Sequence, residues 1–231
     1  MALAWDRFAE EVARRKPVFW LRDDDAVAVT PALQRLVSFG VPVALAVIPD
    51  LAEPELFKTN GVTFLQHGCD HRNRAAAGEK KTEFPATEAI PDALERLRAS
   101  RERLVAMGGD RVLPVVAPPW NRMRRELVVE LPRIGIRGFS GYRGEAVPNL
   151  VQHDTHVDIV AWKAGRRFIG DEEAARLAMT YVLKDASVGW LTHHAVHDAA
   201  AWSFLERLFA LRGPRWAGAA ELFSYTRPAR G

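Results

Sequence analysis

The sequence predicts an α/β protein in which strand–helix units surround a parallel sheet. Short apolar runs alternate with stretches of helical periodicity, which is the pattern of βα units. Apolar residues make up 48% of the 231-residue chain, enough for a large core. The length suits one barrel-like domain or two small ones. Because no low-complexity linker or internal repeat divides the sequence, we expect a single domain over 1–231.

Local signals place the elements in order along the chain. Strands are expected at the apolar runs 18–21, 41–48, 62–66, 112–117, 137–140, 157–162 and 188–192. A helix should begin with Thr30 as N-cap and Pro31 in its first turn, and end at Gly40. Asp92 and Glu95 have the spacing of a capping box for another helix. Further helices are expected at 123–132, from 171 and at 199–211, and a loop over the functional site at 75–90.

Charge and composition limit the classes of binding partner that we expect for the protein. A formal net charge of +3, with basic residues only in short clusters, gives no argument for nucleic-acid binding. Cys69 is the single cysteine, so no intrachain disulfide can form, which favours a reducing compartment. The amphipathic segment 1–16 lacks the features of a secretory signal, and no run approaches the roughly 18 apolar residues of a membrane span. We expect a soluble, cytoplasmic protein without a membrane partner; a homo-oligomer is left open.

Polar clusters follow at least four of the expected strands. They are residues 22–25, 66–71, 118–121 and 192–194. The carboxyl ends of parallel strands share one rim, where α/β proteins build their sites. We therefore expect these side chains to meet.

Two of these clusters have the chemistry of a metal site. Asp23, Asp24 and Asp25 would repel one another, and a divalent cation relieves that repulsion, although a solvated loop also fits. His67 and His71 are four residues apart and can face the same ion, although two surface histidines are the alternative. Two imidazoles and one carboxylate leave coordination positions open, a set that suits Zn²⁺, Fe²⁺ or Co²⁺.

The other clusters supply an acid and aromatic walls. A histidine such as His193, leaving a buried strand, can act as a general acid because its pKa lies near neutrality; a hydrogen-bonded pair with His194 is the alternative. Trp120 can form a stacking wall for a sugar. Asp158 and Trp162, four residues apart, are either part of the site or a strand-end acid and a core aromatic.

These motifs, in this order from Arg22 to His194, resemble the polysaccharide deacetylases, the carbohydrate esterases that include chitin, peptidoglycan and nodulation-factor deacetylases. The matching features are the double Asp, the His-x-x-x-His, the Pro-Pro-aromatic segment, the Asp-x-x-x-Trp segment and a late Leu-x-His. The resemblance implies a distorted (β/α) barrel of about seven strands. It also implies metal-dependent removal of an acetyl group from an N-acetylated, carbohydrate-like substrate, small or oligomeric.

The resemblance assigns roles by position. One Asp would be the general base and the next a metal ligand with His67 and His71, and His193 would be the acid. We prefer Asp24 as base and Asp25 as ligand, with Asp23 and Asp24 as the other register. Zn²⁺ is the expected metal, with Co²⁺ or Fe²⁺ as alternatives. The residues expected to contact substrate are Arg22, Asp23, Pro119, Trp120, Asn121, Asp158, Trp162, Leu191 and His194.

The sequence also departs from the family pattern. The arginine that usually precedes the Pro-aromatic segment and orients the catalytic Asp is replaced by Ala117, and Arg22 or Arg122 could substitute. Ala26 stands where a Gly usually follows the Asp pair. These departures leave open another hydrolytic or lyase chemistry on the same metal site, or a domain that binds a sugar or partner without turnover.

Overall fold

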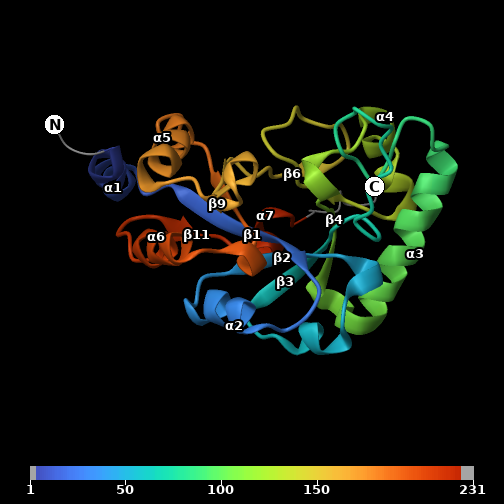
Figure 1. Cartoon of the computed structure of the whole chain (residues 1–231), viewed down its shortest axis with the longest axis horizontal. Helices are drawn as coiled ribbons and strands as arrows, with labels where there is room; N and C mark the ends of the chain where they lie inside the picture. Colours follow the sequence, from blue (N-terminus) through green and yellow to red (C-terminus); the bar gives the residue numbers. More distant parts are fainter. Residues whose placement is uncertain (1–3, 225–231) are drawn as a thin grey trace, which may run out of the picture.

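A curled parallel sheet forms the centre of the computed structural model, which describes residues 4–224 (Figure 1). Its strands follow the order β6-β5-β4-β3-β2-β1-β10-β7, with β11 beside β1. The bounds are β1 Val18–Ala26, β2 Val43–Val47, β3 Val62–Gln66, β4 Val112–Val116, β5 Gly138–Phe139, β6 Val151–Gln152, β7 Val157–Asp158, β10 Val188–Thr192 and β11 Arg215–Trp216. The expected α/β class and parallel sheet are confirmed.

The sheet returns to its starting point through one stretch of chain, residues 151–158. The first part of this stretch, β6, pairs with β5, and its last part, β7, pairs with β10. Between them, Thr155 donates its backbone N–H to Gly141, and His156 donates to Gly189. The two short strands therefore act as one irregular strand that pairs with β5 at its start and with β10 at its end. It closes a distorted barrel, as expected from the sequence.

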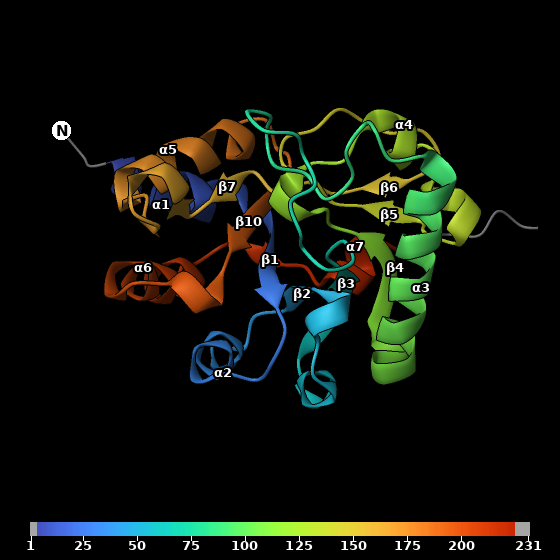
Figure 2. The ribbon, with the colours of Figure 1, turned by 45° about the vertical axis from the view of Figure 1, so that its right-hand side comes forward.

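Helices cover the outside of the barrel (Figure 2). They are α1 Ala4–Arg15, α2 Pro31–Ser38, α3 Ile90–Gly108, α4 Arg125–Val128, α5 Asp171–Val182, α6 Ala199–Phe209 and α7 Ala219–Leu222. A small hairpin of β8 (Val160–Ala161) and β9 (Arg167–Phe168) follows β7. None of the helices within residues 4–224 has the length and apolar character needed to span a membrane.

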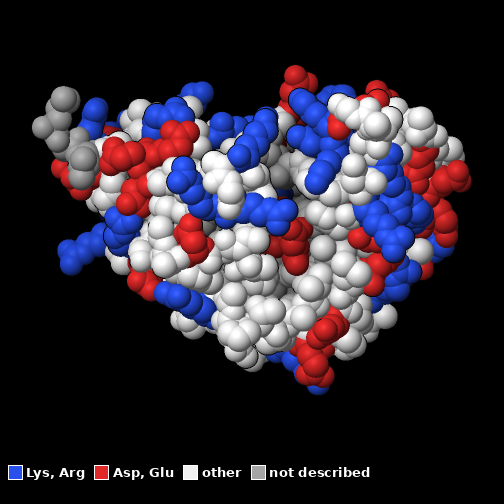
Figure 3. All heavy atoms as spheres, in the orientation of Figure 1, with Lys and Arg blue, Asp and Glu red and all other residues white. Residues whose placement is uncertain are grey.

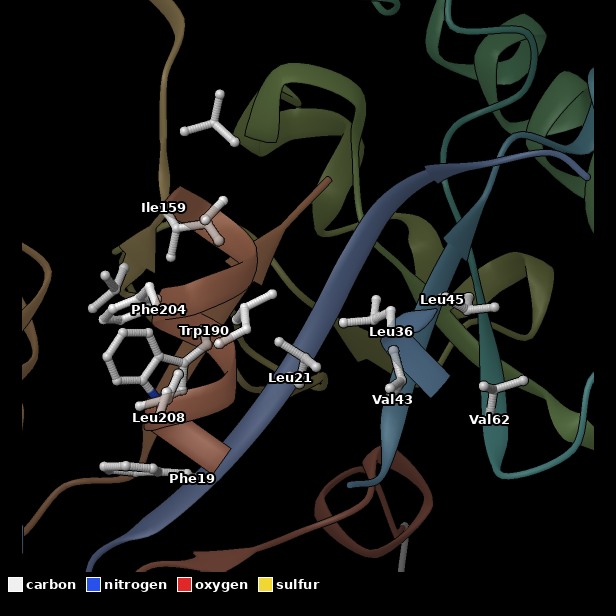
Figure 4. Packing of buried hydrophobic residues seen from close by; sticks show 14 of the residues in the cluster. Phe19, Leu21, Leu36, Val43, Leu45, Val62, Ile159, Trp190, Phe204 and Leu208 are labelled. Carbon is white, nitrogen blue, oxygen red and sulfur yellow. The ribbon is translucent and has the colours of Figure 1, made fainter. Parts of the chain in front are cut away.

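The main core lies between β1, β10 and the helices that cover them (Figure 4). Phe19 and Trp190, on neighbouring strands, meet edge-on with ring centroids 5.7 Å apart, and Trp190 also contacts Phe204 of α6. On the other face of β1, Trp20 points toward Phe223, just after α7, inside a second cluster lined by small residues of β2. This alternation along β1 fixes its register, which in turn fixes where its aspartates emerge.

Some expected elements match and others do not. Strands 62–66 and 188–192 have the expected bounds, and Thr30 caps α2 by accepting a hydrogen bond from Leu33. The capping box at Asp92 is wrong, because α3 begins at Ile90 with Pro91 in its first turn. The strand expected at 157–162 is interrupted after Asp158, whose carboxylate accepts the Val160 amide. The helix at 123–132 shrinks to a single turn, α4, followed by a 3₁₀ turn.

Candidate active site

Three side chains from the ends of β1 and β3 converge at the carboxyl edge of the sheet. Asp25 Oδ1 lies 3.1 Å from His67 Nε2 and 3.2 Å from His71 Nε2. One donor atom from each residue lies within 4.8 Å of the others. A left-handed φ of 67° at Asp25 turns this carboxylate out of the strand, where the pairing between β1 and β2 also shifts. The arrangement brings together the ligands expected from the sequence.

The hydrogen bonding around these three groups fits a cation. Asp25 Oδ1 is buried and has no hydrogen-bond partner among residues 4–224. His67 Nδ1 faces the Ala117 carbonyl at 2.8 Å, so that nitrogen carries the proton and leaves Nε2 as a lone-pair donor. Burial raises the pKa of Asp25, but the neighbouring imidazoles lower it by a larger amount. The pKa of Asp25 is therefore below its usual value. A divalent ion would supply the charge that the orphaned oxygen lacks.

Arg22 orients Asp24 from the same strand. Its Nε and Nη2 donate to the two carboxylate oxygens of Asp24 at 2.8 and 3.0 Å, and both side chains are buried. Arg22 Nη2 also donates to Asn121 Oδ1, and Nη1 donates to the carbonyl and hydroxyl oxygens of Ser140. Arg22 therefore occupies the orienting role that the sequence left open at Ala117, whereas Arg122 is exposed and bonds to the Lys81 carbonyl.

Asp23 points to the other side of β1 and does not face a substrate. Its carboxylate accepts from the Thr192 hydroxyl at 2.7 Å and the His194 amide at 2.9 Å, and lies 2.5 Å from His194 Nδ1. Both side chains are buried, and so is Leu191. The structure thus differs from the substrate contacts expected for these three residues, because consecutive residues of a strand alternate between faces. Asp25 rather than Asp24 lies with the two histidines, because the left-handed φ at Asp25 breaks the alternation that would otherwise place it on the Asp23 side.

His193 directly follows β10, which pairs with β1 on the side away from β2 and β3. Its ring meets Trp162 edge-on at 4.6 Å, and Trp162 Nε1 donates to Asp158 Oδ2 at 2.8 Å. Its backbone amide donates to His197 Nε2 at 3.3 Å, a support that the sequence did not suggest. Burial raises the pKa of Asp158, whereas the charge of His193 opposes that rise. Trp162 is 40% exposed, so it is a wall of the site rather than a core residue.

Trp120 forms a second aromatic wall. The ring lies 4.4 Å from that of His71, and a left-handed φ of 54° turns the residue toward the rim. Pro119 is buried and packs so closely on Gly68 that a Cβ at Gly68 would lie 2.7 Å from the proline ring. Of the segment expected to touch substrate, Trp120 is placed to do so, whereas Pro119 and Asn121 support the residues around it.

Glu83 is a supporting residue that the sequence did not reveal. Its fully buried carboxylate accepts the backbone amides of Cys69 and Asp70, at 3.0–3.1 Å, inside the turn that joins His67 to His71. Burial raises the pKa of Glu83 against the effect of these amides. Cys69 is buried in the core, and burial raises the pKa of its thiol to about 12. No local pattern marks residue 83 as the partner of a turn thirteen residues away.

The comparison with solved structures gives a consistent result. A carbohydrate esterase of family 4 from Streptococcus mutans superposes with a TM-score of 0.62, over 92% of this chain and 90% of that one, at 12% identity. The chain has the polysaccharide deacetylase fold. A peptidoglycan deacetylase from Bacillus subtilis gives a TM-score of 0.54 at 16% identity, over 89% of each chain. A family 4 esterase from Streptomyces lividans, solved with acetate, gives 0.53 at 12%, over 84% and 86%.

Sequence comparisons alone find nothing. No protein-family model matches the chain, and no curated protein matches it either. The polysaccharide deacetylase fold is therefore visible in the strand order and barrel closure rather than in overall sequence similarity.

Proposed function

We propose that the protein is a metal-dependent hydrolase that removes an acetyl group from an N-acetylated sugar or a related amide. The observation that carries the proposal is the convergence of Asp25, His67 and His71 beside a carboxylate that Arg22 holds in place. A divalent cation held by these three side chains would polarise an acyl oxygen and make water a better nucleophile. The deacetylase fold of the solved structures above supports the same reaction class.

The protein's own residues can divide the proton transfers between them. Asp24 keeps free lone pairs on both oxygens while Arg22 fixes its plane, so it is suited to accept a proton from attacking water. His193 follows β10, on the other side of β1 from the strand that precedes His67, and is suited to deliver a proton to the departing amine. Trp120 and Trp162 can hold the sugar between them and exclude water.

Metal analysis followed by an acetate-release assay tests this proposal. The purified protein should bind one equivalent of Zn²⁺ or Co²⁺ and release acetate from at least one N-acetylated sugar in a panel. Asp24→Asn should retain the metal and lose acetate release, whereas the control Asp110→Asn, on a distant 3₁₀ turn, should keep both. Metal binding without release from any N-acetyl or O-acetyl substrate would point to another chemistry, and no metal binding would contradict the proposal.

A further inference from the structure

Exposed cations lie beside both aromatic walls of the candidate active site. At the first wall, Lys81 Nζ is 6.0 Å from the centre of the Trp120 ring, and Arg122 donates to the Lys81 carbonyl. At the second wall, Lys163 directly follows Trp162, which contacts His193. Figure 3 shows Lys and Arg side chains on both sides of the hollow in the middle of this face. An exposed cation thus occurs next to each wall, and the second wall also has the partly buried carboxylate of Asp158, which accepts from Trp162 Nε1.

The segment after Trp162 is unusually one-sided in charge. Residues 162–168 contain Lys163, Arg166 and Arg167 and no acidic residue. The hairpin of β8 and β9 fixes this segment: Ala161 pairs with Arg167, and the Arg166 amide donates to the Ala161 carbonyl. Because the hairpin grows from the carboxyl end of β7, it stands at the same rim as the metal-binding side chains.

These cations differ from most of the surface arginines in having no acidic partner. On the helices, Arg98, Arg133 and Arg176 each pair with a glutamate three residues away. We call Lys81, Arg122, Lys163, Arg166 and Arg167 the rim group, and among residues 4–224 no ion pair involves any of them. The remaining residues, 1–3 and 225–231, contain no Asp or Glu.

The centre of the site does not offset this positive rim. Arg22 already neutralises Asp24, and a divalent cation would more than neutralise Asp25. Asp158 is a further carboxylate at the second wall, and its two oxygens accept the Val160 amide and the Trp162 indole N–H. A cleft lined by charge of one sign attracts ligands of the opposite sign and raises their rate of capture. The small overall charge of +3 conceals this local excess.

Resting on the proposed function, we propose that the site takes an N-acylated sugar that carries a negative group, a phosphate or a carboxylate. The rim group binds this anion while the acyl group lies over Asp25, His67 and His71. Each exposed contact contributes little by itself, so the selectivity comes from several cations together.

Matched sugars test the proposal. Acetate release would be measured from N-acetylglucosamine, N-acetylglucosamine 6-phosphate and N-acetylmuramic acid, which are neutral, phosphorylated and carboxylated. At low salt, kcat/KM should be about tenfold higher for one of the anionic sugars, and the phosphate and carboxylate arms show which anion is preferred. The advantage should shrink at about 1 M NaCl, where the screening length falls to about 3 Å. Equal kcat/KM values for neutral and anionic sugars would overturn the proposal.

Charge reversal locates the effect. Lys163→Glu combined with Arg166→Glu should lower kcat/KM for the preferred anionic sugar about tenfold and change that for the neutral sugar less than about twofold. Arg212→Glu is the matched control, because Arg212 is exposed and lies just before β11, which pairs with the opposite end of β1. A similar loss for both sugars, or the same loss in the Arg212 variant, would overturn the proposal.

A binding measurement separates this inference from the proposed function. Calorimetric titration of the metal-free protein avoids direct contact between phosphate and a metal. Tighter binding of an anionic sugar than of N-acetylglucosamine, abolished by the double reversal, would support the inference even if no sugar released acetate. In that case only the proposed reaction would fail. If no acetate is released and binding does not discriminate, the inference is overturned.

Discussion

The guanidinium of Arg22 donates two hydrogen bonds to the carboxylate of Asp24, which lies in the same strand. The two residues are separated by one position, so their side chains share a face of β1. The remaining guanidinium donors reach Ser140 and Asn121, which ties β1 to the segments after β5 and β4. The direction of the proposed base therefore depends on one buried cation that three parts of the barrel hold.

Arg22→Lys should lower kcat for acetate release by about 100-fold while preserving metal binding, because an ammonium cannot reproduce the fork that orients Asp24. Arg22→Ala should also lower the free energy of unfolding by about 3–5 kcal/mol, since it leaves a buried carboxylate unpaired. Steady-state kinetics measure the change in kcat, and urea unfolding measures the change in the free energy of unfolding. Arg133→Lys, in an exposed pair with Glu130, is the control and should change neither.

His67→Ala and His71→Ala should each abolish tight binding of Zn²⁺, because two ligands seldom hold the ion. The two variants should differ in their stability when no metal is bound. His67 is buried and bonded to the Ala117 carbonyl, so its loss should cost about 1–3 kcal/mol of stability, whereas the more exposed His71 should cost less. Metal analysis and urea unfolding check this. His153→Ala should keep the metal; if both ligand variants also kept it, the site would be misassigned.

Glu83→Ala should weaken Zn²⁺ binding by about 10–100-fold, because the turn between the two histidines would lose the acceptor for its amides. Glu83→Gln should lie between the wild type and Glu83→Ala, since one amide oxygen remains as an acceptor. Competition with a chelator of known affinity gives the dissociation constants. Glu79→Gln, on the exposed part of the same loop, is the matched control. Unchanged affinity in Glu83→Ala would remove the supporting role.

Gly68→Ala should destabilise the protein strongly, by about 3 kcal/mol or more. The added Cβ would lie 2.0 Å from Glu83 Oε2 and 2.7 Å from the Pro119 ring, at a φ of +63°. Gly40→Ala is a fitting comparison, because Gly40 has a φ of +75° and a Cβ added there would meet no atom within 4 Å. The control should therefore show only the backbone penalty of about 1 kcal/mol. Thermal unfolding of the two metal-free variants measures the difference.

His156 should make the protein less stable in acid. Burial lowers its pKa in the folded state to about 4, below the usual 6.5. Between these values the unfolded chain binds the proton more readily, so stability falls as pH drops from about 6.5 to about 4. Its Nδ1 accepts the Gly189 amide, a bond that His156→Asn can retain. Urea midpoints from pH 7 to pH 4 should fall less steeply in this variant, and parallel slopes would contradict the assignment.

The fold was more predictable from the sequence than the details of its strands. Short, mostly apolar runs such as 62–66 and 188–192 mark largely buried strands, and their bounds agree with the structure. The interruption after Asp158 depends on a carboxylate that captures a backbone amide two residues ahead. The joining of β6 and β7 into one barrel strand depends on two tertiary pairings, Val151 with Gly138 and Val157 with Trp190, and local patterns do not contain that information.

The candidate site divides in a similar way. The positions of Asp25, His67 and His71 follow from strand ends and a four-residue spacing, both of which can be read locally. The interior pairing of Asp23 with His194 depends on which face of β1 each aspartate occupies, and three consecutive aspartates conceal that register. Glu83 lies in a loop without periodicity, so its burial beneath the histidine turn could come only from tertiary structure.

The double pairing of residues 151–158 has a consequence for self-association. An open sheet would present unpaired amides and carbonyls along its two outer strands, where a second molecule could add a strand. Here the stretch that ends one side of the barrel also begins the other. A second molecule could add a strand only after residues 151–158 had separated from β5 or β10. The pairing of this stretch on both sides, rather than repulsion between side chains, therefore disfavours aggregation by strand addition.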